Sequence, residues 1–323
     1  MEIKNNNQHW NDYWSQGHKT SFGSAFTNCY EGVIKATWLQ YFKTLKSNSK
    51  VLDLCTGNAS LLRIAKSCLN EDNNIHFTGV DYADINTSDG FAKLSNINLM
   101  FNVNIEQLPF EADSFDYVIS NFGIEYSNLN KSLAEASRVL SIGGKLELVC
   151  HCYDSTIINS NANELAMLNL MLSEGNVLDN LKALIKALVI REKNKLQASA
   201  SEQDSYQAAC QSAEKFRHKL NDKIAIIDNS FTKALHESEF LAFLKYLLSK
   251  QCQDKETTLR AFKNSMQAHN SRLSAMINAA LSKTLLTSIS ELLKENGLSL
   301  LNIKDVVNED GKIACQISAK KHT

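Results

Sequence analysis

Residues able to do chemistry are concentrated first at residues 50–62, in the sequence KVLDLCTGNASLL. A hydrophobic run that contains Asp53 breaks there at CTGN and resumes as an apolar segment with helical spacing. This pattern predicts a buried parallel strand, a tight loop and a helix. Gly57 permits a close approach of the backbone, and the free N–H groups at the helix start favour polar or anionic ligand atoms. The segment is therefore a candidate ligand-binding loop.

Acid–base groups stand at three further places. Glu125 and Tyr126 follow one hydrophobic segment, His151 follows another, and His18 lies in an aromatic-rich N-terminal segment. A carboxylate in a closed, partly apolar pocket can take a proton from an attacking hydroxyl or orient an amine. The alternative for Glu125 is a solvated side chain at a helix start, stabilised by the helix dipole. Both interpretations stay open from the sequence.

The elements that must position these residues follow from the hydrophobic periodicity. Residues 31–46 and 285–298 have helical spacing, and Gly297 is placed to end the second of these helices. Between residues 138 and 145, a helix end followed by Gly143 and Gly144 predicts a turn into a strand. We expect strands near 51–54, at 75–81, 99–103, 115–121 and 145–150, and near 299–307 and 312–320.

The segment from Asp53 to Ala59 resembles motif I of the class I S-adenosylmethionine (SAM) dependent methyltransferases, D/E-x-G-x-G-x-G, with Cys55 and Ala59 in place of two glycines. Further matches follow in order: Asp81 at the end of the second expected strand, then NIEQLPF, SFDYVIS and RVLSIGG. The core resembles that of ubiquinone and menaquinone methyltransferases. The resemblance implies an α/β fold, with a doubly wound, seven-stranded, mostly parallel sheet of the Rossmann-like type.

The same resemblance implies SAM as the cofactor and assigns roles by position. The two carboxylate oxygens of Asp81 match two vicinal ribose hydroxyls. Asn104, where the family has Asp, would accept from the adenine amino group, and the backbone N–H of Ile105 would meet a ring nitrogen. The backbone of Asn121 is expected near the methionine part of SAM. The other expected cofactor contacts are Trp14, Ser21, Asp53, Cys55, Thr56, Gly57, Asn58, Tyr82 and Phe122.

Three regions are expected along the chain. Residues 1–46 form an N-terminal cap and the first helices, and the catalytic domain is discontinuous, at 47–154 and 284–323. Residues 155–283 are expected to form a helical insertion of four or more helices, because the sequence from 176 to 296 lacks glycine and proline and shows helical spacing. The insertion is interpreted as a substrate cover, a homodimer surface or added bulk. The cap would cover the cofactor and the substrate; alternatively, its tryptophans only pack a helix.

Composition excludes several classes of protein. A net charge of −1, with 21% charged residues, provides no field to attract nucleic acid or an anionic membrane. The absence of a signal-peptide pattern or a long apolar run predicts a cytoplasmic protein without a membrane span. Eight cysteines lack metal-type spacing, which is typical of reduced thiols. The one cluster, Cys150-His151-Cys152, would need further ligands to hold a metal, so no metal is expected.

Two functions remain. The first is a SAM-dependent methyltransferase acting on an O, N or C nucleophile of a small molecule, or of a carrier- or peptide-bound natural-product intermediate, by alignment and exclusion of water. Its catalytic candidates are Glu125, Tyr126 and His18; many members of the family carry histidines at the first two positions. The alternative is a SAM-fold interaction protein without transferase activity, with the insertion as its partner surface. Loss of two motif-I glycines favours it, whereas the retained acids oppose it.

Overall fold

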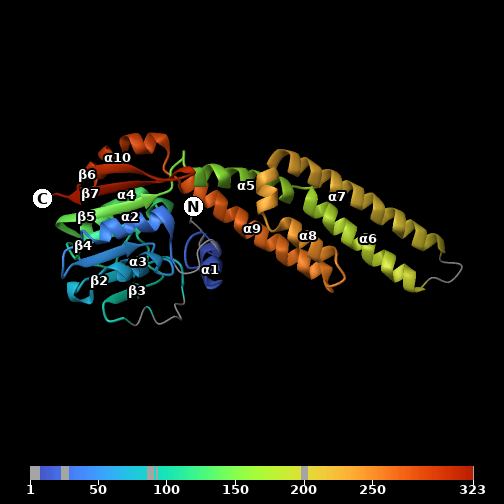
Figure 1. Cartoon of the computed structure of the whole chain (residues 1–323), viewed down its shortest axis with the longest axis horizontal. Helices are drawn as coiled ribbons and strands as arrows, with labels where there is room; N and C mark the ends of the chain where they lie inside the picture. The colour runs from blue at the N-terminus through green and yellow to red at the C-terminus, as the bar shows by residue number, and fades with distance from the viewer. Residues whose placement is uncertain (1–7, 23–28, 86–90, 92–93, 198–202, 323) are drawn as a thin grey trace. The chain divides into compact units, whose positions relative to one another are not determined.

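The computed structural model describes residues 8–22, 29–85, 91, 94–197 and 203–322. The chain divides into two compact units, Met1–Asn159 together with Ala275–Thr323, and Ser160–Ser274 (Figure 1). The expected limits of the insertion, residues 155 and 283, lie just before the first helix and just after the last helix that enter the second unit.

The first unit contains one seven-stranded sheet with the order β3-β2-β1-β4-β5-β7-β6. Strands β1 to β5 pair in parallel, and β7 runs antiparallel between β5 and β6. This is the doubly wound, mostly parallel sheet that the sequence predicts. The strands are β1 Lys50–Leu54, β2 His76–Val80, β3 Ile97–Met100, β4 Phe115–Asn121, β5 Leu140–Cys150, β6 Leu298–Asn308 and β7 Gly311–Lys321.

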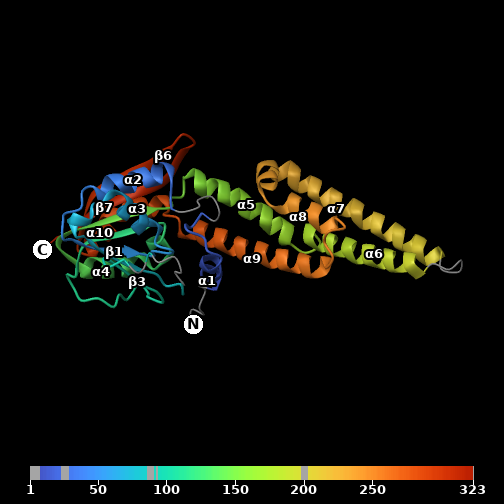
Figure 2. The ribbon, with the colours of Figure 1, turned by 60° about the horizontal axis from the view of Figure 1, so that its bottom comes forward.

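Helices cover both faces of this sheet (Figures 1 and 2). On β1, Leu52 and Leu54 join one core while Val51 joins the other, because successive side chains of a strand point to opposite faces. The first core contains buried residues of α4 and α10, and the second contains those of α2 and α3. The helices and single turns of this unit are α1 Gln8–Ser15, α2 Gly32–Phe42, α3 Ser60–Cys68, η2 Glu71–Asn73, η4 Ile124–Tyr126, α4 Leu129–Val139 and α10 Lys283–Glu295.

Two predicted strand boundaries are wrong. The third strand is Ile97–Met100 rather than 99–103, because the backbone of Asn102 is left-handed (φ 59°) and ends the extended segment. Gly143 and Gly144 do not form a turn before β5 but lie inside it. The pairing of β4 with β5 shifts register there, and Gly143 adopts φ 81°, so the glycines accommodate a strand irregularity.

In its described residues, the second unit consists of helices joined by short turns. Its core contains buried Leu, Ile, Met and Phe side chains at helical spacing, such as Leu181, Leu184 and Ile185. The longest helix has a kink at Phe231, where φ is −139° and ψ is 38°. The helices that contribute to the unit are α5 Thr156–Leu172, α6 Val177–Gln197, α7 Gln203–Glu237, α8 Phe240–Leu248 and α9 Lys255–Ala279.

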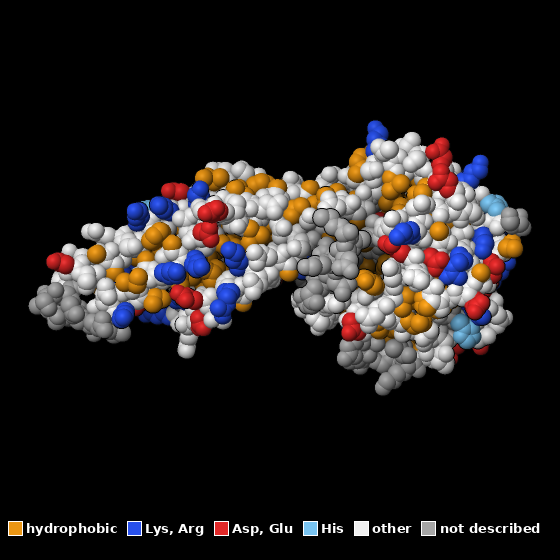
Figure 3. Space-filling model, turned by 180° about the vertical axis from the view of Figure 1, so that it is seen from behind, with side chains coloured by type: hydrophobic (Ala, Val, Ile, Leu, Met, Phe, Trp, Pro, Cys, Tyr) orange, Lys and Arg blue, Asp and Glu red, His pale blue; other side chains and the backbone are white. Residues whose placement is uncertain are grey.

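The surface carries mixed charge. Figure 3 shows acidic and basic side chains interspersed over the described part of the face in view. Among the described helices, none combines the length and the apolar character that crossing a bilayer requires. All eight cysteines are free thiols.

Candidate active site

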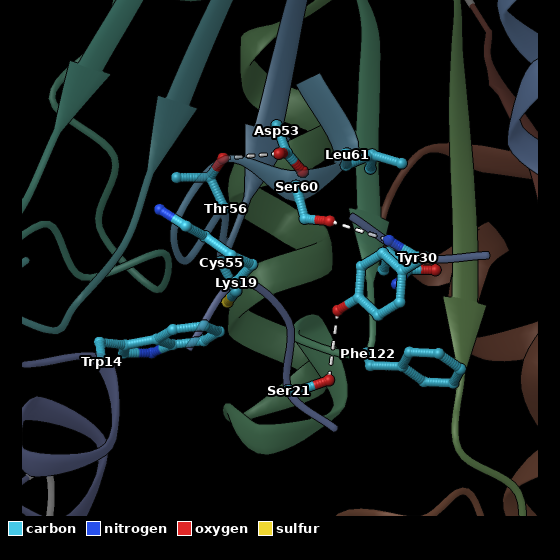
Figure 4. Close-up of a pocket in the computed structure, with 11 residues that line it drawn as sticks. Trp14, Lys19, Ser21, Tyr30, Asp53, Cys55, Thr56, Ser60, Leu61 and Phe122 are labelled. Atoms are coloured by element: carbon cyan, nitrogen blue, oxygen red, sulfur yellow. Dashed lines mark hydrogen bonds between the residues drawn. The ribbon is translucent and has the colours of Figure 1, made fainter. Parts of the chain in front are cut away.

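A pocket lies at the carboxyl ends of β1 and β4, where the strand order of the parallel sheet reverses (Figure 4). Ligands of open α/β sheets bind at such a switch point. Its empty volume, counted together with the space open to solvent, is about 330 Å³. The lining residues are Trp14, Lys19, Ser21, Tyr30, Asp53, Cys55, Thr56, Ser60, Leu61, Asn121 and Phe122.

The loop between β1 and α3 has an alternating left-handed backbone. Cys55, Gly57 and Ala59 adopt φ values of 58°, 54° and 60°. These are the three positions at which motif I carries glycine. A left-handed conformation costs a residue with a Cβ about 1–2 kcal/mol. The loop therefore keeps the backbone shape of a glycine-rich loop although glycine occupies only one of the three positions.

Asp53 is buried beneath this loop, with 1% of its surface exposed. Thr56 Oγ1 donates to Asp53 Oδ2 at 2.7 Å (Figure 4). The pKa of the Asp53 carboxyl is raised to about 8, because burial and the charge of Asp81, which raise it, together outweigh the Thr56 hydrogen bond, which lowers it. Asp53 and Thr56 thus hold the start of the loop against the end of the strand.

Asp81 directly follows β2, and its carboxylate accepts hydrogen bonds from the loop after β1 and from the loop after β2. Its Oδ2 accepts the Gly57 N–H at 2.8 Å and its Oδ1 accepts the Ala83 N–H at 2.9 Å. Burial raises the pKa of this carboxyl, and the backbone hydrogen bonds lower it. A carboxylate offers about four acceptor positions, and backbone N–H groups of Ala83, Gly57 and Tyr82 occupy part of them.

The described part of the N-terminal segment lies over the loop. The indole of Trp14 covers Gly57 so closely that a Cβ there would be 2.7 Å from the ring. Asn58 Nδ2 donates to the His18 carbonyl at 2.5 Å, and the His18 ring stacks on Tyr13 at 4.3 Å. These contacts satisfy both interpretations of the segment, since a packed helix also covers the loop. The His18 imidazole therefore packs against Tyr13, another residue of the N-terminal segment.

Other expected cofactor contacts lie outside the lining of this pocket. Asn104 is exposed, and its Oδ1 accepts the Glu106 N–H at 2.9 Å. Ile105 is buried, and Tyr82 is 47% exposed. Asn121 lines the pocket and is fixed by Trp38, whose Nε1 donates to its Oδ1 at 2.7 Å.

Four lining residues were missed as site residues by sequence reasoning: Lys19, Tyr30, Ser60 and Leu61. The Tyr30 backbone N–H donates to Ser60 Oγ at 3.2 Å, and its hydroxyl lies 3.2 Å from Ser21 Oγ (Figure 4). The aromatic-rich pattern of residues 1–30 was the signal available for Tyr30. Ser60 and Leu61 are brought to the pocket by the first turn of α3, which a motif of glycines and acids does not mark.

Glu125 is buried, so the interpretation of a solvated side chain at a helix start is wrong. It lies in η4, directly after β4, and pairs with His151, the first residue after β5. The distance from His151 Nδ1 to Glu125 Oε1 is 2.9 Å, and both side chains have 0% exposure. The parallel pairing of β4 and β5 brings their carboxyl ends together and so brings these two residues into contact. Sequence analysis named His151 only as one candidate among several.

The cysteines that flank His151 are buried. Burial raises the pKa of the Cys150 thiol well above its usual range, which opposes the thiolate that a metal needs. Within the described ranges, no three His, Cys, Asp or Glu side chains are arranged to hold a metal ion.

Comparison with known proteins shows similarity to methyltransferases. Residues 33–189 match the model of the ubiE/COQ5 methyltransferase family. Over 105 residues the chain is 37% identical to the ubiquinone/menaquinone biosynthesis C-methyltransferase of Rickettsia massiliae and 36% identical to that of Rickettsia prowazekii. Each match covers 30% of this chain and 42% of the relative, so the chain spans less than half the length of these relatives.

Among solved structures, a putative sarcosine dimethylglycine methyltransferase from Galdieria sulphuraria matches at a TM-score of 0.38 and 14% identity, over 90% of this chain and 84% of that one. This score is too low to base any argument on. The family match and the strand order, with β7 antiparallel between β5 and β6, agree with the motif order read from the sequence. Residues 33–189 of this chain are therefore similar to the class I SAM-dependent methyltransferases, whose cofactor is S-adenosylmethionine.

Proposed function

We propose that this protein transfers a methyl group from SAM to an O, N or C nucleophile of a small molecule, or of a carrier- or peptide-bound intermediate. The observation that carries the proposal is the left-handed backbone at Cys55, Gly57 and Ala59. A loop that no longer bound a cofactor would have no need for strained conformations at two residues with side chains. The rival function, an interaction protein without transferase activity, lacks a reason for that strain.

The residues fit the cofactor in charge and shape. Bound SAM supplies a methyl group already activated by its sulfonium. Asp81 is placed to hold two hydroxyls, and the lack of a Cβ at Gly57 lets the Trp14 ring lie against the loop. Asp53 lies buried with a pKa of about 8, so a nearby positive charge would favour its ionised form. Trp14 and the residues around it exclude water from the loop.

The acceptor is the less defined partner. The matched relatives are named as C-methyltransferases of ubiquinone and menaquinone biosynthesis, which makes carbon the first acceptor atom to test. The match to the family model ends at residue 189, so most of the second unit lies outside it. We therefore propose the helical unit as the part that adapts this chain to its own acceptor, as a substrate cover or as a homodimer surface. A cytoplasmic location remains our expectation.

The proposal is tested on the purified full chain. Calorimetric titration with SAM and with S-adenosylhomocysteine should give saturable binding of both. Methyl-labelled SAM is then incubated with a panel of phenols, amines and carbon acids, and transfer is measured by recovered label. Binding of neither compound would favour the interaction protein. Saturable binding with label recovered in one acceptor class supports the transferase.

A further inference from the structure

The buried pair His151 and Glu125 is not among the residues that we propose to hold the cofactor. Both side chains have 0% exposure, and they lie at the adjoining carboxyl ends of β5 and β4. Burying a polar pair costs free energy unless each polar atom finds a partner. Here two atoms do not: within the described part of the chain, His151 Nε2 and Glu125 Oε2 have no hydrogen-bond partner. Such atoms in a native structure call for an explanation.

The hydrogen bonds of Glu125 Oε1 fix the tautomer of the imidazole. This oxygen accepts the His151 backbone N–H at 3.0 Å and lies 2.9 Å from His151 Nδ1. Because a backbone N–H can only donate, Oε1 is held as an acceptor, and the ring must place its hydrogen on Nδ1. The lone pair of the neutral ring is then on Nε2. The arrangement leaves a basic nitrogen with an orienting carboxylate behind it.

Aromatic rings lie around the imidazole. Ring centroids of Phe122, Tyr126 and Phe22 lie 4.3, 6.1 and 6.4 Å from that of His151. The Tyr126 hydroxyl is buried and, among described residues, has no partner. Burial, with the charge of Glu125, raises the pKa of Tyr126 well above its usual range, so the phenol stays protonated and serves as a donor rather than a base. A ligand here would meet one acceptor and one donor between apolar walls.

We propose that His151 Nε2 is the proton acceptor of the reaction and that Glu125 is its positioning residue, for an acceptor molecule that attacks through, or is activated by, a hydroxyl group. The inference rests on the proposed methyl transfer. The new bond forms between the attacking atom and the methyl carbon, while the sulfur–methyl bond breaks and its electron pair stays on sulfur. The substrate proton passes to Nε2, and the imidazolium is stabilised beside the Glu125 carboxylate before it returns the proton to solvent.

A hydroxyl-bearing acceptor suits this pair better than an amine. A neutral amine already carries a nucleophilic lone pair and can lose its proton after transfer, so alignment alone serves it. A hydroxyl is a weak nucleophile until its proton is removed, and a positioned base contributes about 10²–10⁴-fold to such a step. The Tyr126 hydroxyl can orient a second oxygen of the same substrate.

The tautomer is testable without any substrate. The full chain is labelled with ¹⁵N-histidine, and long-range ¹H–¹⁵N spectra assign the protonated nitrogen of each ring. We expect His151 to carry its hydrogen on Nδ1 with Nε2 bare, and Glu125→Gln, whose amide can donate to Nδ1, to shift the population toward Nε2–H. A wild-type ring protonated on Nε2 overturns the proposal, whatever the outcome for SAM binding.

Kinetics provide the second arm. His151→Asn keeps an amide N–H near the position of Nδ1, and hence the bond to Glu125, but removes the base. We expect kcat for the acceptor found in the labelled-methyl panel to fall at least about 100-fold, with the Kd of SAM within about threefold. His269→Asn, in the helical unit, is the matched control and should leave both unchanged. A kcat of His151→Asn within threefold of wild type overturns the role of the base, whereas failure of wild type to bind SAM overturns the proposed function instead.

Discussion

Each of the two units contains a contact between a His and a Glu side chain, fully buried in the sheet unit and partly exposed in the helical unit. In the sheet unit, His151 and Glu125 are completely buried and one nitrogen of the ring is unpaired among the described residues. In the helical unit, His269 Nε2 lies 2.9 Å from Glu164 Oε1, and Arg272 Nη2 lies 3.0 Å from His269 Nδ1. The side chains of this second pair are 36% and 30% exposed.

The difference separates a structural link from a chemical site. Both ring nitrogens of His269 are occupied, so this ring can join α5 to α9 but has no free lone pair for a substrate. His151 contacts Glu125 through Nδ1, and its ring packs against Phe122, while Nε2 has no partner among the described residues. A pairing of His with Glu is therefore not informative by itself. What distinguishes the sheet unit is burial combined with an unpaired nitrogen at the carboxyl edge of parallel strands.

Removing the carboxylate from each pair should give the largest contrast. Glu125→Ala leaves two buried donors of His151 without an acceptor, and each costs about 1–3 kcal/mol, so we expect the free energy of unfolding to fall by about 2–6 kcal/mol. Glu164→Ala should cost about 0.2–1 kcal/mol, as for other partly exposed ion pairs. Urea unfolding of both variants measures the contrast. Equal losses would show that the buried pair is not exceptional.

Removal of an acid near the loop tests the same contrast for ligand binding. Asp81→Ala would remove the two charge-assisted hydrogen bonds that we propose between this carboxylate and the ribose hydroxyls of SAM, worth about 1.5–3 kcal/mol each, so the affinity for SAM should fall at least about 100-fold. Asp254 caps α9 of the helical unit by accepting the Thr257 N–H, and Asp254→Ala should leave SAM affinity unchanged. Calorimetry decides; an unchanged affinity in the Asp81 variant would sink the assignment of this acid.

The pH dependence of stability should come from the sheet unit. The Asp53 carboxyl has a folded pKa of about 8, above its unfolded value near 3.9, so the folded protein holds this proton more tightly. Its contribution is therefore fully present below the unfolded pKa and is lost as pH rises through about 8. Between pH 6 and pH 8 the loss is about 1.4 kcal/mol per pH unit.

Asp53→Asn removes this titration and keeps an oxygen to accept from Thr56. The stability difference between wild type and this variant, measured by urea unfolding from pH 6 to pH 9, should change with the stated slope and level off above pH 8. Asp254→Asn is the control, because its pKa is lowered and it stays ionised throughout that range. A flat difference for Asp53→Asn would refute the burial argument.

The sequence was informative wherever a local pattern carries the physics. The hydrophobic run of β1, buried on both faces, and the position of Asp81 just after β2 specify two strands and an acid at one edge. The Glu125–His151 contact was beyond reach, because it depends on the register of β4 against β5. The residues next to Glu125 and His151 in the sequence do not indicate that these two side chains are in contact. Gly143 and Gly144 inside β5 show the same limit, because glycine is common both in turns and in strand bulges.

The smallest expected effect concerns Cys55, which occupies a glycine position of the loop. Cys55→Gly relieves a left-handed backbone worth about 1–2 kcal/mol but removes a packed side chain, so the free energy of unfolding should change by about 1 kcal/mol or less, and SAM affinity should stay within tenfold. Unfolding of this variant or complete loss of binding would assign a specific role to the thiol.

A second substitution shows what Cys55 demands of its surroundings. A Cβ at Gly123 would lie 2.4 Å from the Cys55 Cβ, so Gly123→Ala should destabilise by about 1–3 kcal/mol in wild type. In the Cys55→Gly background that clash is gone, and the nearest remaining atom is Ser120 Oγ at 3.1 Å. The two changes should then couple favourably by at least about 1 kcal/mol.

Gly175→Ala in the helical unit is the control. Here φ is 70° and no atom lies within 4 Å, so this substitution should cost about 1 kcal/mol with or without Cys55. Urea unfolding of the double-mutant cycle measures the coupling, and additive effects at residues 55 and 123 would mean that the loop relaxes around the thiol.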